Sequence, residues 1–195
     1  MGKVTVIGGA GFLGRYLVKR LAQQGLQVRV AVRDPEAASF LKPMGDVGQV
    51  QPIQANIRNQ ASIARAVAGA DVVINLAGVM FPGGAQSFQA VHVDGAETVA
   101  RAAAAAGVGR LIHISAIGAD AEADSKYARS KATGEAMVRA AYPDASIVRP
   151  STIFGAEDHF FNLFARLATL TPVMPLLGGG NRCMQPVYVG DVAQA

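Results

Sequence analysis

The sequence predicts an α/β fold, a doubly wound parallel sheet with helices on both faces. Short runs rich in valine and isoleucine alternate with longer segments of helical character along most of the 195 residues. Strands separated by helices favour right-handed crossovers, which place the strands parallel to one another. A glycine-rich turn also joins the first strand-like run to the first helix-like segment. Both observations are typical of a sheet that is buried on its two faces.

Six strands are predicted from apolar runs that are bounded by turn residues. KVTVIG opens the chain, and DVVINLAG in its first half is apolar almost throughout, as expected of a strand covered on both sides. QVRVAV alternates between polar and apolar residues in its first half, which also favours a strand. The six expected strands are 3–8, 27–32, 50–53, 71–78, 110–116 and 145–150.

Five helices are predicted between and beside these strands. The first, 12–25, ends at Gly25, a residue that commonly terminates helices. The second, 34–41, begins with Asp34 as a cap and has Pro35 at its first helical position. The remaining helices are expected at 62–69, 87–107 and 125–141.

Composition narrows the function classes. Only 16% of the residues are charged, and the net charge is +4. The basic residues are scattered along the sequence and are not accompanied by aromatic residues on which bases could stack, so nucleic-acid binding is not expected. The single cysteine, Cys183, excludes an intramolecular disulfide and favours a reducing compartment, for which we expect the cytoplasm. We expect no metal site.

The turn GGAGFLG after the first strand places Gly8, Gly11 and Gly14 three residues apart. The first glycine allows a sharp turn, the second allows a pyrophosphate to approach the backbone, and the third allows the helix to pack closely. The helix N-terminus that follows favours negatively charged phosphates. The motif predicts a dinucleotide site of the Rossmann type, and a purely structural glycine turn is the alternative.

The dinucleotide itself is less well determined by the sequence. Arg33 follows the second strand, where a guanidinium could pair with the 2′-phosphate of NADP(H). Asp34 lies at the spacing of a carboxylate that binds the ribose of NAD(H), but it is better explained as a helix cap. We therefore expect NADP(H), with NAD(H) as the alternative.

Tyr127 and Lys131 are four residues apart on a predicted helix and therefore share one of its faces. Their helix follows the strand that ends near Ser115, whose hydroxyl could hold a substrate oxygen. A neighbouring ammonium would lower the pKa of the tyrosine, as a general acid or base near neutral pH requires. The alternative is that Tyr127 packs in the core and Lys131 is solvated.

These features together resemble the short-chain dehydrogenase/reductase superfamily. The resemblance rests on the glycine motif, NLAG at 75–78, Ser115 and the Tyr-x-x-x-Lys pair, while SIVRPSTIFG at 146–155 and QPVYVGDVA resemble its extended and atypical branch of epimerases and dehydratases. One accessory subunit of respiratory complex I is related to this superfamily, and four stretches look most like that subunit and its bacterial relatives. These stretches are GGAGFLGRYLVKRL, VHVDGAETVARAA, RLIHISAIGAD and KYARSKATGE.

The resemblance implies a role for each matching residue. It assigns Ser115, Tyr127 and Lys131 to catalysis, with Lys131 also holding the nicotinamide ribose. His92 stands where the superfamily often has an asparagine of the proton relay, and it either replaces that residue or packs as a neutral side chain. The implied cofactor-binding residues are Gly8, Gly11, Phe12, Leu13 and Gly14 at the pyrophosphate, Arg33 at the 2′-phosphate, Asn56 and Ile57 at the adenine, Leu76, Ala77 and Gly78 at the adjacent ribose, and Pro150 near the nicotinamide.

Two parts of the chain are expected. Residues 1–155 would form the dinucleotide-binding domain, and 156–195 would begin a small C-terminal lobe for a substrate or partner. That lobe would be half built where the sequence ends, so we expect a fragment, a truncation or an unusually short chain. The apolar face of the helix at 159–170 either packs internally or docks on a membrane-bound partner.

Two functions are compatible with these expectations. The first is an oxidoreductase or epimerase-type enzyme that acts on an unidentified small molecule through Tyr127 and Lys131. The second is a dinucleotide-binding accessory or assembly subunit of a quinone-linked respiratory complex, which would place the protein peripherally at the inner face of the membrane. In the complex I subunit the dinucleotide is generally regarded as structural.

Overall fold

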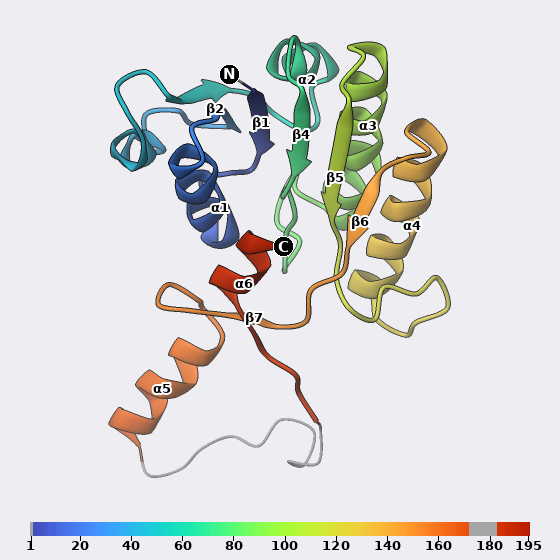
Figure 1. Ribbon diagram of the computed structural model, residues 1–195. Helices are drawn as coiled ribbons and strands as arrows, with labels where there is room; N and C mark the ends of the chain where they lie inside the picture. The colour runs from blue at the N-terminus through green and yellow to red at the C-terminus, as the bar shows by residue number, and fades with distance from the viewer. Residues whose placement is uncertain (1, 172–182) are drawn as a thin grey trace.

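A six-stranded parallel sheet forms the centre of the structure, with helices on both of its faces (Figure 1). The computed structural model describes residues 2–171 and 183–195. The strand order is β3-β2-β1-β4-β5-β6, so the direction in which strands are added reverses between β1 and β4. The doubly wound fold predicted from the sequence is confirmed. The strands are β1 (Lys3–Ile7), β2 (Gln27–Val32), β3 (Val50–Gln54), β4 (Val72–Asn75), β5 (Arg110–Ile114) and β6 (Ser146–Val148).

Alternate residues of each strand enter separate hydrophobic cores on the two faces of the sheet. Val6 of β1, for example, pairs in register with Val30 and Ile74, and all three belong to the core beneath α1 (Phe12–Gln23). The opposite core contains Val99 and Leu111 and lies beneath three helices. These helices are α2 (Gln60–Val67), α3 (Asp94–Ala105) and α4 (Lys126–Ala141). The layers hold the carboxyl ends of the strands at a common edge.

The helix predicted for residues 34–41 is not formed. This segment makes turns and then a short 3₁₀ helix, η1 (Ser39–Met44). The expected cap is nevertheless present, because the Asp34 carboxylate accepts hydrogen bonds from the backbone N–H groups of Glu36 and Ala37 at 3.0 and 3.1 Å. The segment is too short to sustain an α-helix, and Pro43 removes a backbone donor at its end.

The helix predicted for residues 87–107 is interrupted near its start. It begins with a π-helical turn, η2 (Gln89–Val93), and becomes α-helical at Asp94. Such turns re-aim side chains relative to a regular helix. The wider turn contains His92, whose ring is buried among residues of the candidate site.

The C-terminal part forms a small separate sheet and two helices. Strands β7 (Ile153–Phe154) and β8 (Val187–Tyr188) pair in parallel, α5 (Phe161–Leu170) extends away from the main sheet, and α6 (Val189–Gln194) returns to α1 (Figure 1). The proline- and glycine-rich loop expected after residue 170 falls largely on 172–182, which lie outside the described residues. None of the helices in the described part of the chain is long and apolar enough to cross a membrane.

Candidate functional site

The glycine turn after β1 brings the chain close to the end of β4. Gly8 has a φ of +77°, a conformation that side chains disfavour, and its N–H donates to the Ala31 carbonyl at 2.9 Å. A Cβ atom at Gly8 would lie 3.2 Å from the backbone nitrogen of Ala77. The turn therefore lies directly against the segment that follows β4.

The other two glycines of the motif have different surroundings. Gly11 is the N-cap of α1, and a Cβ added there would meet only the Gly8 carbonyl oxygen, at 3.5 Å. A Cβ at Gly14 would instead clash with the backbone of Gly9, because the helix packs closely on the turn. The backbone at Gly11 is therefore open to a ligand, whereas Gly14 is needed for the close packing of the helix on the turn. A pyrophosphate site requires both features.

The remaining residues expected to hold a cofactor all follow strands of the sheet. Asn56 shapes the turn after β3 by accepting a hydrogen bond from Arg58 N–H at 3.0 Å. Ile57 packs against the start of α3, since a Cβ at Gly95 would lie 2.8 Å from Ile57 Cγ1. The structure places these residues at the carboxyl edge as a set: Phe12 and Leu13 after β1, Arg33 after β2, Asn56 and Ile57 after β3, Leu76, Ala77 and Gly78 after β4, and Pro150 after β6.

The Tyr127 ring lies in an aromatic cluster at the start of α4. It meets the rings of Phe88 and His92 edge to face, at centroid distances of 5.9 and 5.5 Å, and these two rings stack on each other at 5.2 Å. Burial raises the pKa of Tyr127. The lowering expected from a neighbouring ammonium is therefore wrong, and the phenol is protonated at neutral pH.

His92 is held as a neutral ring by two hydrogen bonds. Its Nε2 accepts from the Val79 N–H at 3.0 Å, so Nδ1 carries the proton and donates to Ser130 Oγ at 2.9 Å. Ser130 Oγ in turn donates to the Tyr127 carbonyl at 2.7 Å. Burial, together with the charge of Lys131, lowers the pKa of His92 to about 4. Of the two expectations for His92, the geometry favours the packed neutral side chain.

Lys131 is buried, with its ammonium directed at the end of β5. Nζ donates to the Ile114 carbonyl at 2.9 Å, and a Cβ at Gly78 would lie 3.8 Å from it. Burial lowers the pKa of Lys131 to about 8, although the charge of Glu135 acts to raise it. The ammonium is therefore mostly charged at neutral pH. It lies beside the residues that contact Gly8, so it faces the same edge as the glycine turn.

Glu135 and Arg149 form an ion pair close to Lys131, and this pair was not predicted from the sequence. Arg149 Nε and Nη2 donate to the two carboxylate oxygens of Glu135 at 2.8 and 2.6 Å, and Glu135 is almost fully buried while Arg149 is half exposed. Burial acts to raise the pKa of Glu135, but the hydrogen bonds and charge of Arg149, together with the nearby hydroxyl of Ser115, lower it overall. The spacing of Glu135, four residues after Lys131, indicates that these two side chains lie close together, but it does not indicate the contact with Arg149.

Ser115 lies at the centre of this polar group. It is 4% exposed, and its Oγ has no hydrogen-bond partner of ordinary geometry among the described residues, although it lies close enough to Glu135 to affect the pKa of that carboxyl. Asn75 and His113 pair beside it, with Asn75 Nδ2 3.1 Å from His113 Nδ1. A buried hydroxyl without a partner is costly unless a ligand binds to it.

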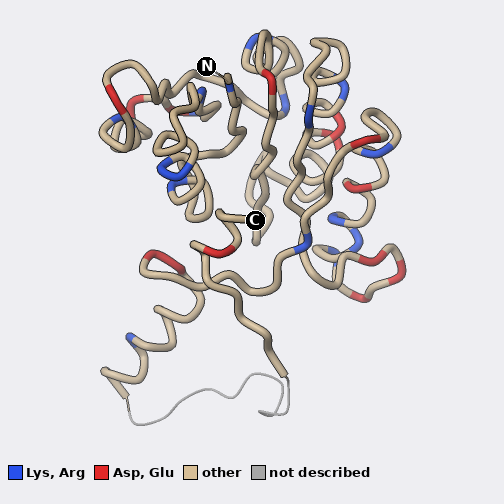
Figure 2. The backbone as a smooth tube through the Cα atoms, viewed as in Figure 1, with Lys and Arg blue, Asp and Glu red and all other residues tan. Residues whose placement is uncertain are grey.

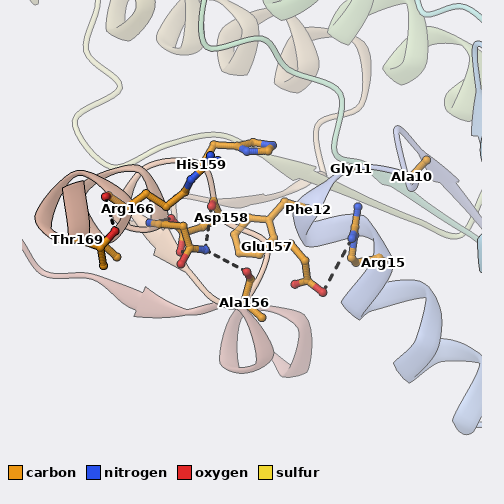
Figure 3. Close-up of a pocket in the computed structure, with 12 residues that line it drawn as sticks. Ala10, Gly11, Phe12, Arg15, Ala156, Glu157, Asp158, His159, Arg166 and Thr169 are labelled. Atoms are coloured by element: carbon orange, nitrogen blue, oxygen red, sulfur yellow. Dashed lines mark hydrogen bonds and ion pairs between the residues drawn. The ribbon is translucent and has the colours of Figure 1, made fainter.

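A hollow of about 760 Å³ separates the glycine turn from the C-terminal part (Figure 3). Gly11, Phe12 and Arg15 line one side of it, and Asp158 and Arg166 line the other. Glu157 connects the two sides, because it accepts a hydrogen bond from Tyr16 at 2.6 Å and lies 3.9 Å from Arg15. Tyr127, Lys131 and Ser115 do not line this hollow.

Comparisons with known proteins agree with this architecture. The profile of the NAD dependent epimerase/dehydratase family matches residues 4–195. The chain belongs to this family. Among solved structures, a dTDP-glucose 4,6-dehydratase from Streptomyces venezuelae with NAD bound superposes with a TM-score of 0.83 at 26% identity, over 98% of this chain and 69% of that one.

The curated relatives of this chain include subunits of NADH-ubiquinone oxidoreductase and reductases. The NADH-ubiquinone oxidoreductase 40 kDa subunit of Neurospora crassa is 41% identical over 98% of this chain and 50% of the relative. The ceramide reductase of Caulobacter vibrioides is 38% identical over 98% of this chain and 59% of the relative. The resemblance to the complex I subunit is confirmed, and the chain spans about half the length of that subunit.

We expect Gly11→Val to abolish dinucleotide binding while leaving the fold intact. The added side chain would enter the open space above the turn and not the core. Gly14→Val is the matched comparison, because its side chain would clash with the backbone at Gly9 and should lower the free energy of unfolding by about 1–3 kcal/mol. Calorimetric titration with NADP(H) and thermal unfolding of both variants measure the difference. Near-normal binding by Gly11→Val would show that the phosphates lie elsewhere.

Glu135→Gln should move the pKa of Lys131 further down from about 8, because the carboxylate that raises it is lost. Stability should also fall, because the amide that replaces the carboxylate loses the charge-assisted hydrogen bonds from Arg149. Titration of the Lys131 Nζ signal by NMR measures the first effect. Glu97→Gln removes an exposed pair on α3 and should change neither quantity. An unchanged Lys131 pKa in Glu135→Gln would contradict the coupling.

Proposed function

We propose that this protein is an NAD(P)(H)-dependent oxidoreductase that interconverts a carbonyl group and an alcohol. The observation that carries the proposal is the protonated Tyr127 phenol, on the same helix as a buried lysine whose ammonium faces the end of β5, next to the unpartnered hydroxyl of Ser115. Two relatives support carbonyl chemistry by name. One is the ceramide reductase, and the other is a farnesyl-dihydroquinoline-oxide ketoreductase of Stigmatella aurantiaca, 32% identical over 98% of this chain and 62% of the relative.

Each residue has a defined role in this reaction. The bound dinucleotide supplies or accepts hydride at the substrate carbon. Ser115 holds the substrate oxygen with its free hydroxyl, and Tyr127 donates its proton to that oxygen during reduction. Lys131, whose ammonium is directed at the end of β5, holds the nicotinamide ribose. His92 and Phe88 position the Tyr127 ring.

The second candidate function is a dinucleotide-binding subunit of a respiratory NADH dehydrogenase complex. It is supported by the names of relatives, which include the alpha subcomplex subunit 9 of mouse, 42% identical over 97% of this chain and 51% of the relative. In that role the dinucleotide would stabilise the fold without turnover. The protein would then lie peripherally at the inner face of a membrane.

Two variants distinguish these functions. If the protein is an enzyme, Tyr127→Phe should lower turnover about 10²- to 10⁴-fold and leave cofactor affinity nearly unchanged. If it is an accessory subunit, Tyr127→Phe should have almost no effect on cofactor binding or on thermal stability with cofactor. Lys131→Ala should weaken cofactor binding in both cases and reduce the stabilisation that the ligand provides. Steady-state NADPH consumption and thermal shift with and without NADPH measure these effects.

We also propose that NADP(H) is preferred over NAD(H). Arg33 follows β2, is exposed and makes no hydrogen bond or ion pair with the other described residues, so its guanidinium is free to bind a 2′-phosphate. A charge-assisted contact of this kind contributes about 1.5–3 kcal/mol. Arg33→Ala should therefore weaken NADPH binding about 10- to 100-fold without affecting NADH. Equal affinities for both dinucleotides before and after the substitution would exclude the preference.

A further inference from the structure

The loop between β4 and α3 carries exposed apolar side chains at the edge of the candidate site. Met80 is 64% and Phe81 is 83% exposed. After these two residues a β-bridge closes a turn, in which the N–H groups of Gly83 and Gln86 donate to each other's carbonyls at 3.2 and 3.0 Å. Large apolar side chains that a loop holds in water favour contact with a partner or ligand.

Both ends of this loop are attached to the residues around Tyr127. At one end, Val79 N–H donates to His92 Nε2 at 3.0 Å. At the other end, the ring of Phe88 meets Tyr127 at 5.9 Å and stacks on His92 at 5.2 Å. Met80 immediately follows Val79, so the apolar tip of the loop begins at the aromatic cluster that positions the proposed acid.

A second exposed apolar side chain leaves the sheet from the neighbouring strand. Ile117 follows Ser115 by two residues and is 59% exposed. Its backbone is fixed, because Ile117 N–H donates to the Pro150 carbonyl at 2.9 Å. Since β4 and β5 are adjacent in the sheet, the loops that carry Phe81 and Ile117 start from the same edge. Exposed apolar groups therefore occur on both loops that border the reacting residues.

The charge on the second loop restricts what can bind there. Asp120, Glu122 and Asp124 follow Ile117 closely, and Figure 2 shows this acidic loop just before α4. Three cations belong to its surroundings: Lys126, at the first position of α4, Arg129, whose guanidinium donates to the backbone carbonyls of Ala123 and Asp124, and Arg149, whose charge interacts with Asp120. The charged side chains of the loop itself, at 120–124, are all acidic, and their negative charge disfavours an anionic substrate such as a nucleoside diphosphate sugar.

We propose that the substrate is a neutral ketone or secondary alcohol with a long hydrocarbon chain. The chain would lie across Met80, Phe81 and Ile117, while the oxygen would lie at Tyr127 and Ser115. This substrate class rests on the proposed carbonyl–alcohol reaction and makes it more specific. The reaction moves a hydride and a proton onto the carbonyl, so the reduced dinucleotide is the only reductant required.

A homologous series of ketones tests the proposal. With NADPH or NADH as donor, kcat/KM should rise about twofold to fourfold for each methylene added between 2-butanone and 2-decanone, because each buried methylene favours binding. Phe81→Ser and Ile117→Ser should flatten this dependence. Val47→Ser is the matched control, since Val47 is fully exposed on the loop before β3, at the opposite edge of the sheet, and should leave the dependence unchanged. A kcat/KM that does not vary with chain length would overturn the proposal.

A binding measurement keeps the proposal testable if no ketone is reduced. The neutral apolar dye N-phenyl-1-naphthylamine should bind with a fluorescence increase in the presence of dinucleotide, and Phe81→Ser should reduce its affinity at least fivefold while Val47→Ser does not. Binding of this kind without turnover would refute the proposed oxidoreductase and support the apolar site. Turnover of ketones with equal dye affinity in all variants would support the oxidoreductase and refute the apolar site.

Discussion

The candidate site depends on how the ammonium of Lys131 is held in a nearly buried position. Its hydrogen bond to the Ile114 carbonyl places it at the end of β5, and the carboxylate of Glu135 below keeps it charged. Glu135 is in turn held by two hydrogen bonds from Arg149, which follows β6. The ammonium of Lys131 is thus fixed relative to strands β5 and β6 and helix α4. Ser115 lies between these elements. Moving any of these elements would move the ammonium away from the cofactor edge.

Close helix packing makes this arrangement possible. Gly134 lies where α4 crosses the π-helical turn η2, and a Cβ there would clash with the carbonyl of His92. The missing side chain lets α4 approach until Ser130 reaches the ring of His92 and the ring of Tyr127 meets it edge to face. The π-helical turn and the glycine act together, because one directs the histidine ring and the other allows α4 to reach it.

The sequence predicted the strands and the glycine turn well because their signals are local. Short apolar runs between helix-like segments located all six strands of the main sheet, and the spacing of Gly8, Gly11 and Gly14 indicated the turn. It did not predict the pKa of Tyr127, because a shared helical face does not determine where an ammonium points. Nor did it predict the pair of Glu135 and Arg149, since this contact depends on β6 lying beside α4. The π-helical turn has no sequence signal of comparable strength.

Two groups of the candidate site, the ammonium of Lys131 and the hydroxyl of Ser115, are buried at a cost to folding. A buried lysine with a pKa of about 8 binds its proton less tightly than it would in the unfolded chain, so its burial opposes folding below that pH and does so less as the pH rises toward its ordinary pKa. An apolar residue at position 131 would remove this penalty and still fill the space. The buried Ser115 hydroxyl without a regular partner adds a second penalty of the same kind. In the proposed function, a dinucleotide ribose would bind beside Lys131 and a substrate oxygen beside Ser115, and these contacts would offset the cost of burial. Ligand binding that offsets these costs would raise the free energy of unfolding, so the proposed function links the stability of the fold to the occupancy of the site.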